Sequence, residues 1–74
     1  MSPNETKRER FVRIASRRTN QVLGELRKLG NCSNTRMYDY SEADVRKIFR
    51  AIKKELDRVE KLFSSEDADE FSLE

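Results

Sequence analysis

Apolar residues recur along two stretches of the chain at alternating steps of three and four. The first set is Val12, Ala15, Thr19, Val22, Leu26 and Leu29, with threonine as its polar member. The second set is Val45, Phe49, Ile52, Leu56, Val59 and Phe63. This spacing puts each set on one face of an α-helix and suits a packed helix seam. We call the sets the first and the second apolar stripe, and they predict an all-α protein with two amphipathic helices.

The first helix is predicted over about residues 3–29. Ser2 and Glu5 have the spacing of a capping box, and Pro3 stands at the first helical position, which proline favours. Gly30 is expected to end the helix as a left-handed C-cap.

The second helix is predicted over about residues 41–63. Ser41 and Asp44 form a variant of the capping box, with Asp in place of Glu. The stretch that follows, residues 64–74, contains five acidic residues and no basic one. We expect an acidic, disordered tail there, because such a composition buries too little apolar surface to order a chain.

Residues 1–63 are expected to form an antiparallel two-helix hairpin, closed by the connector of residues 30–40. The composition is 41% charged and 35% hydrophobic, which makes a lone two-helix hairpin marginally stable. A second copy is therefore expected to cover the two stripes, giving a homodimer that packs four helices into a bundle. Alternatively, the connector spans to the second chain in a swapped arrangement. Tyr38 and Tyr40 either plug the end of the small core or stack on bases.

The net charge of +2 hides a separation of charge along the chain. Residues 1–29 carry eight Lys/Arg and three Glu, and residues 41–63 carry seven basic and five acidic side chains. The tail has three interpretations. It is a plain disordered end, it folds over the protein's own basic face, or it presents a nucleic-acid-like pattern of charge to a basic partner.

Basic side chains gather opposite both apolar stripes when the helices are drawn at about 100° per residue. Arg and Lys on a helix face match the charge spacing of nucleic acid, and guanidinium groups pair bidentately with phosphate or carboxylate. The alternative is a solvated surface that keeps the helices soluble. The candidate contacts with nucleic acid or an acidic partner are Arg10, Arg13, Arg17, Arg18, Arg46, Lys47, Arg50 and Lys54.

The residue inventory argues against catalysis and against a metal or other cofactor. The chain has no histidine, its only cysteine is Cys32, and its two glycines form no phosphate-binding loop. We therefore expect neither an enzyme nor a small-molecule substrate. The single cysteine and the lack of a signal peptide or long apolar run indicate a cytoplasmic protein with no membrane association.

Three segments across about residues 10–63 carry a resemblance to known sequences: Leu26–Asn34, Tyr38–Tyr40 and Asp44–Ile52. They resemble short uncharacterised helical-hairpin proteins of bacteria and their phages or mobile elements, which brings no assigned activity. The resemblance implies a bacterial or phage-borne regulatory or defence-related role. Two hypotheses follow: a regulatory protein whose basic helix faces contact nucleic acid, or an inhibitor or adaptor of the anti-CRISPR or antitoxin kind that acts on a protein partner.

Overall fold

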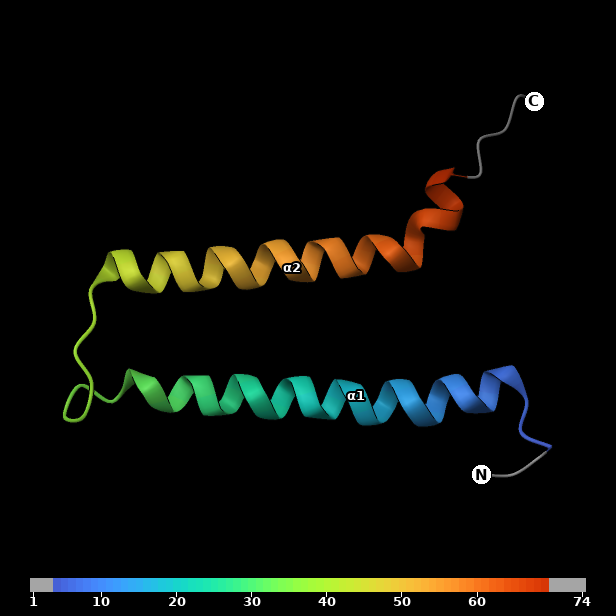
Figure 1. Ribbon diagram of the computed structural model, residues 1–74, viewed down its shortest axis with the longest axis horizontal. Coiled ribbons are helices and arrows are strands. Elements are labelled where there is room, and N and C mark those ends of the chain that lie inside the picture. Colours follow the sequence, from blue (N-terminus) through green and yellow to red (C-terminus); the bar gives the residue numbers. More distant parts are fainter. Residues whose placement is uncertain (1–3, 70–74) are drawn as a thin grey trace. The chain divides into compact units, whose positions relative to one another are not determined.

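The protein is all-α and contains two long helices, as predicted (Figure 1). The computed structural model describes the backbone of residues 4–69 and the side chains of residues 4–64. Helix α1 spans Lys7–Gly30, a short 3₁₀ helix η1 spans Asn31–Ser33, and α2 spans Glu42–Asp69. The chain divides into two units, Met1–Asp39 and Tyr40–Glu74, and each contains one long helix. Packing of the helices as an antiparallel hairpin stays a prediction.

Helix α1 begins at Lys7 rather than at residue 3, because a second capping box lies further along the chain. The Thr6 hydroxyl accepts from the Glu9 N–H at 3.0 Å, and Glu9 Oε1 accepts from the Thr6 N–H at 2.9 Å. These bonds satisfy donors that the first helical turn leaves without partners. The expected Ser2 cap lies outside the described residues, and Glu5, its expected partner, precedes α1.

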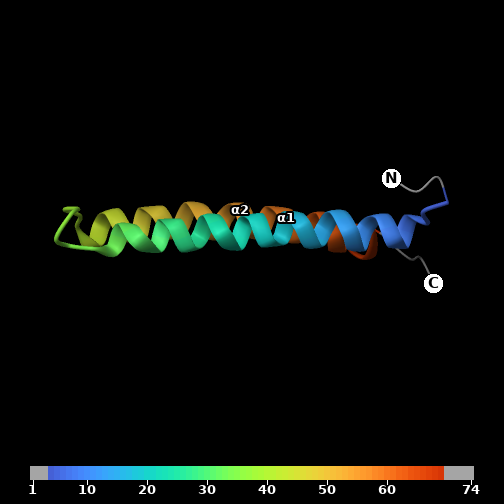
Figure 2. The ribbon, with the colours of Figure 1, turned by 90° about the horizontal axis from the view of Figure 1, so that it is seen from below.

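The predicted left-handed cap at Gly30 is wrong. Gly30 has φ −58° and ψ −29°, and no described residue has a positive φ. The chain instead tightens from α1 into η1, a common way for an α-helix to end. Gly24 also lies within unbroken helix, and α1 runs through it as one continuous element in Figures 1 and 2.

An ordered turn follows η1 and begins the path toward α2. Asn34 Oδ1 accepts from the Arg36 N–H at 3.0 Å, in the manner of an Asx turn. The Asn34 carbonyl accepts from the N–H groups of Met37 at 3.1 Å and Tyr38 at 3.0 Å. Backbone hydrogen bonds therefore hold residues 34–38 in a defined turn.

Helix α2 begins as predicted but ends later. The Ser41 hydroxyl accepts from the Asp44 N–H at 3.1 Å, and Asp44 Oδ2 accepts from the Ser41 N–H at 2.9 Å, which confirms the predicted box. The helix continues past the predicted end at Phe63 to Asp69. The rest of the tail, residues 70–74, lies outside the described residues.

The last turns of α2, drawn in red in Figure 1, bend away from the axis of the earlier turns. The Ser64 hydroxyl donates to the Lys61 carbonyl at 3.4 Å. Serine pairs and hydroxyl bonds to the preceding turn are recognised causes of helix bending, and Ser64 is followed by Ser65. The bend thus falls where the sequence changes from mixed charge to acidic.

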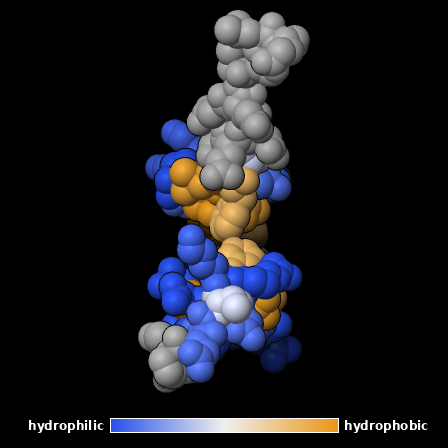
Figure 3. Space-filling view, turned by 90° about the vertical axis from the view of Figure 1, so that its right-hand side faces the viewer, coloured by the Kyte–Doolittle hydropathy of each residue, from blue (hydrophilic) through white to orange (hydrophobic). Residues whose placement is uncertain are grey.

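Both stripes are exposed in part, and no described side chain is fully buried. The half-buried members are Ala15, Leu29, Val45, Ile52 and Val59. Val22 is 54% exposed and Leu56 is 62% exposed. Phe11 and Leu23 widen the first stripe, and Ile48 widens the second, since these residues fall on the flanks of the same helix faces. Figure 3 shows hydrophobic side chains at the surface beside hydrophilic ones. Within the described part, neither helix is long and apolar enough to cross a membrane.

Candidate nucleic-acid interface

The basic residues of α1 lie on the side of the helix away from the first apolar stripe. At the helical repeat, Arg10, Arg13 and Arg17 fall within one narrow arc, whereas Arg18 falls nearer the edge of the stripe. All four side chains are exposed. The structure therefore brings three of the four predicted α1 residues onto one face and leaves Arg18 beside it.

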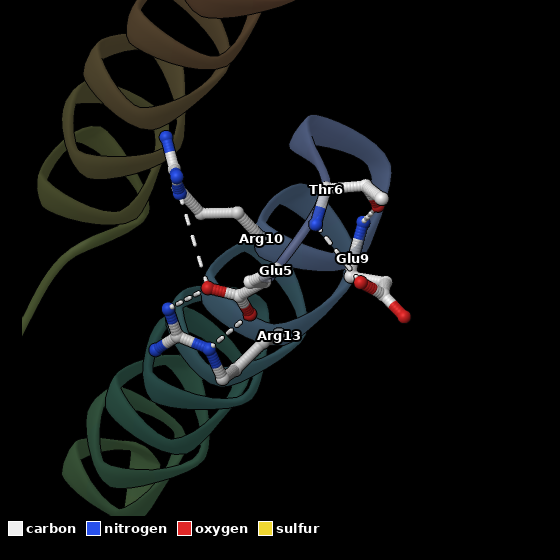
Figure 4. A network of polar contacts seen from close by, with 5 residues as sticks. All are labelled: Glu5, Thr6, Glu9, Arg10 and Arg13. Atoms are coloured by element: carbon white, nitrogen blue, oxygen red, sulfur yellow. Dashed lines mark hydrogen bonds and ion pairs between the residues drawn. The ribbon is translucent and has the colours of Figure 1, made fainter. Parts of the chain in front are cut away.

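Two of those arginines already hold a carboxylate of the same chain (Figure 4). Arg13 donates from Nε to Glu5 Oε2 at 2.8 Å and from Nη2 to Glu5 Oε1 at 2.9 Å. Arg10 Nε lies 3.9 Å from Glu5 Oε1. The hydrogen bonds from Arg13 hold the pKa of the Glu5 carboxyl below its usual value of 4.5, against the smaller opposing effect of burial. We call Arg10 and Arg13 the arginine fork.

Helix α2 carries a denser group of bases. The members of this group, which we call the basic segment, are Arg46, Lys47, Arg50, Lys53 and Lys54. Residues 45–54 contain no acidic residue. None of the five side chains forms an ion pair with a described residue, whereas Arg13, Lys28, Arg58 and Lys61 all do. The charges of the basic segment, like those of Arg17 and Arg18, are therefore available.

The basic segment borders an open groove on one side of α2. The groove is lined by Val45, Arg46, Phe49, Arg50, Lys53, Lys54 and Asp57. Val45 and Phe49 belong to the second apolar stripe, so the groove passes from apolar to basic around the helix. The groove therefore places several cations beside an aromatic side chain.

The two acids that follow the basic segment pair with bases further along the helix. Glu55 accepts from Arg58, and this bond is the main cause of a lowered pKa of the Glu55 carboxyl. Asp57 Oδ2 lies 3.3 Å from Lys61 Nζ. An acid placed three or four positions before a base is the favourable orientation on a helix. Both carboxylates are thereby engaged away from Lys53 and Lys54.

Sequence reasoning missed two residues of this interface. Lys53 is not among the candidate contacts predicted from the sequence, although it lines the groove with Arg50. Glu5 was assigned to a cap, and its pairing with Arg13 spans eight positions, which no helical periodicity predicts. The acidic residue between the N-terminus and a run of arginines was the available signal.

Beyond the two basic faces, the described residues offer little chemistry. No group of three or more potential metal ligands gathers among them, and the Cys32 thiol is exposed and forms no disulfide. Met37 is 70% exposed and Tyr38 is 49% exposed on the turn after η1. No protein-family model matches the chain, and comparisons with curated proteins and with solved structures found no match either.

Proposed function

We propose that this chain is a small non-enzymatic regulatory protein of bacterial or phage origin that binds the phosphate backbone of nucleic acid through its basic helix faces. The observation that carries the proposal is the basic segment of α2, with five cations in nine positions and no ion pair to a described residue. At about 1.5 Å of rise per residue, these charges lie within roughly 12 Å along the helix.

Available charge matters because affinity for nucleic acid comes mainly from cations that replace condensed counterions. A base that already pairs with a carboxylate must give up that pair first. The basic segment has no such cost among the described residues, and its lysines and arginines are exposed. We propose that these cations contact phosphates, so that binding follows the backbone and shape of the nucleic acid rather than its sequence.

The proposal includes a homodimer in which two antiparallel hairpins form a four-helix bundle. Exposed apolar stripes on both helices support it, because a monomer rarely leaves such continuous apolar faces in water. The basic segment lies on the side of α2 opposite most of the second stripe, so covering the stripes leaves the cations outside. Two copies of the basic segment would then act on one nucleic acid.

The exposed thiol of Cys32 supports a reducing compartment, and we propose a cytoplasmic location on that ground. The proposal requires no cofactor and no small-molecule substrate.

Fluorescence anisotropy with labelled random-sequence duplex DNA and duplex RNA tests the proposal. Titrations at about 50 and 200 mM salt should show affinity falling steeply with salt, with a slope of several charges for a dimer. A second duplex of the same length and a different sequence should bind with the same affinity, since no base is read. Absence of binding at the lower salt, or affinity that is flat with salt, contradicts the proposal.

The second candidate is an inhibitor or adaptor that binds a protein partner. The exposed Met37 and Tyr38 on an ordered turn favour it, because methionine and tyrosine are enriched in protein interfaces and a fixed turn loses little entropy on binding. The variant M37S/Y38S separates the two functions. It should leave nucleic-acid affinity unchanged if the basic segment carries the function, and it should abolish partner inhibition if the turn does.

A further inference from the structure

We infer that the arginine fork of α1 is a phosphate site that Glu5 occupies in the unbound protein, so that Glu5 limits nucleic-acid binding by α1. This inference rests on the proposed function, and it adds a built-in competitor to it.

The first step is the geometry of the bound carboxylate. Arg13 holds Glu5 through two parallel N–H···O bonds of 2.8 and 2.9 Å, and Arg10 lies on the side of the same oxygen at 3.9 Å. A guanidinium presents the same planar set of donors to a carboxylate and to a phosphate. The fork therefore already has the arrangement that a phosphate needs.

The second step is access. The Glu5 side chain is 10% exposed, whereas the side chains of Arg10 and Arg13 are 52% and 46% exposed. The carboxylate lies between the two arginines (Figure 4), and both arginine side chains are more exposed than it is. An incoming phosphate can thus approach the arginines before Glu5 leaves.

The third step is that Glu5 can leave without unwinding α1. Glu5 precedes the helix, and the reciprocal bonds between Thr6 and Glu9 hold the first turn independently of it (Figure 4). The ion pairs of Glu25 with Lys28 and of Glu55 with Arg58 differ in this respect, because both partners belong to one helix. Glu5 is thus suited to exchange with an external anion.

The test compares Glu5→Gln with Glu60→Gln in duplex-binding titrations. Each variant removes one negative charge, and Glu60 is exposed and forms no ion pair with a described residue. At about 50 mM salt, E5Q should bind about three- to tenfold more tightly than wild type, with a salt slope steeper by about one. E60Q should gain less than about twofold. Equal gains in the two variants would overturn the inference, and circular dichroism checks that both keep their helices.

A second measurement keeps the inference testable if no variant binds nucleic acid, which would end the proposed function. The Nε resonance of Arg13 is followed in ¹⁵N-labelled wild type and E5Q during addition of inorganic pyrophosphate. A shift at lower pyrophosphate concentration in E5Q supports a fork that Glu5 blocks. No shift in either protein, or the same titration curve in both, overturns it.

Discussion

Arg58 donates to both carboxylate oxygens of Glu55, from Nε to Oε1 at 3.0 Å and from Nη2 to Oε2 at 2.6 Å. The pair turns Glu55 toward the C-terminal end of α2. Lys61 engages Asp57 in the same direction, at 3.3 Å. Glu55 and Asp57 therefore pair with bases that follow them in the sequence. The cations of the basic segment, which precede them, have no carboxylate partner among the described residues.

This arrangement predicts unequal effects for two charge-matched variants. Arg50→Gln removes an available cation and should weaken duplex binding several-fold, with a salt slope smaller by about one. Arg58→Gln removes a cation already paired with Glu55, so its effect should be clearly smaller. Once Arg58 is replaced, Glu55 has no base three or four positions before it to pair with. The cations of the basic segment therefore stay available in the R58Q variant. Equal losses in anisotropy titrations would contradict the assignment.

The pKa of Glu55 predicts a pH dependence of the stability of α2. A carboxyl whose pKa is lower in the folded state contributes stability above its usual pKa of 4.5, and this contribution is lost as pH falls through the folded value. Helix content, followed by circular dichroism, should therefore decline below about pH 4.5 in wild type. Glu55→Gln should reduce that decline, whereas Glu60→Gln should leave the part due to Glu55 in place.

The capping box at the start of α1 predicts a specific loss of stability. Thr6→Ala removes the acceptor for the Glu9 N–H and should cost about 1 kcal/mol of helix stability. Thermal unfolding monitored at the helix band measures the change. Thr35→Ala lies in the connector and should have little effect. If both variants unfold alike, the helix does not depend on this cap.

The two glycines should both accept alanine. Gly24 and Gly30 have helical backbone angles, and a Cβ built on either meets nothing within 4 Å. Gly24→Ala should stabilise the helix by about 0.5–1 kcal/mol, since alanine loses less backbone entropy than glycine. Gly30→Ala should be neutral or mildly stabilising. A marked loss of helix content in G30A would instead support a left-handed cap at Gly30, which the backbone angles contradict.

The proposed dimer depends on the second apolar stripe. Leu56→Gln places an amide in the seam and should weaken self-association about tenfold or more, because each buried leucine contributes about 1.5–3 kcal/mol. Ala51→Gln, outside the stripe on the same helix, is the matched control and should leave association unchanged. Sedimentation velocity over a range of concentrations measures both. A monomeric wild type would exclude the dimer.

Local sequence signals predicted the helices well where a single signal was present. The start of α2 followed from Ser41 and Asp44, whose side chains form both bonds of the box. At α1 two overlapping boxes compete, Ser2 with Glu5 and Thr6 with Glu9. A single chain cannot reveal that Glu5 is engaged by Arg13 instead. The end of α2 was placed too early, because helix propagation carries α2 past the last residue of the second apolar stripe to Asp69.

The interface was only partly predictable for a related reason. Helical periodicity places Arg46, Arg50 and Lys54 on one face, and this can be read from spacing alone. Which cations are available depends on rotamers and on pairs such as Asp57 with Lys61, because Lys53 also lies four positions from Asp57 on its other side. Such choices between neighbours of equal spacing require coordinates.

Each helix of this protein starts with a reciprocal cap that closes over three positions. Ordering such a start needs no distant part of the chain, so both helices can form on the sub-microsecond to microsecond scale of isolated helices. The slow step in folding of the proposed bundle is then the association of two chains. Refolding should accordingly contain one phase whose rate rises with protein concentration.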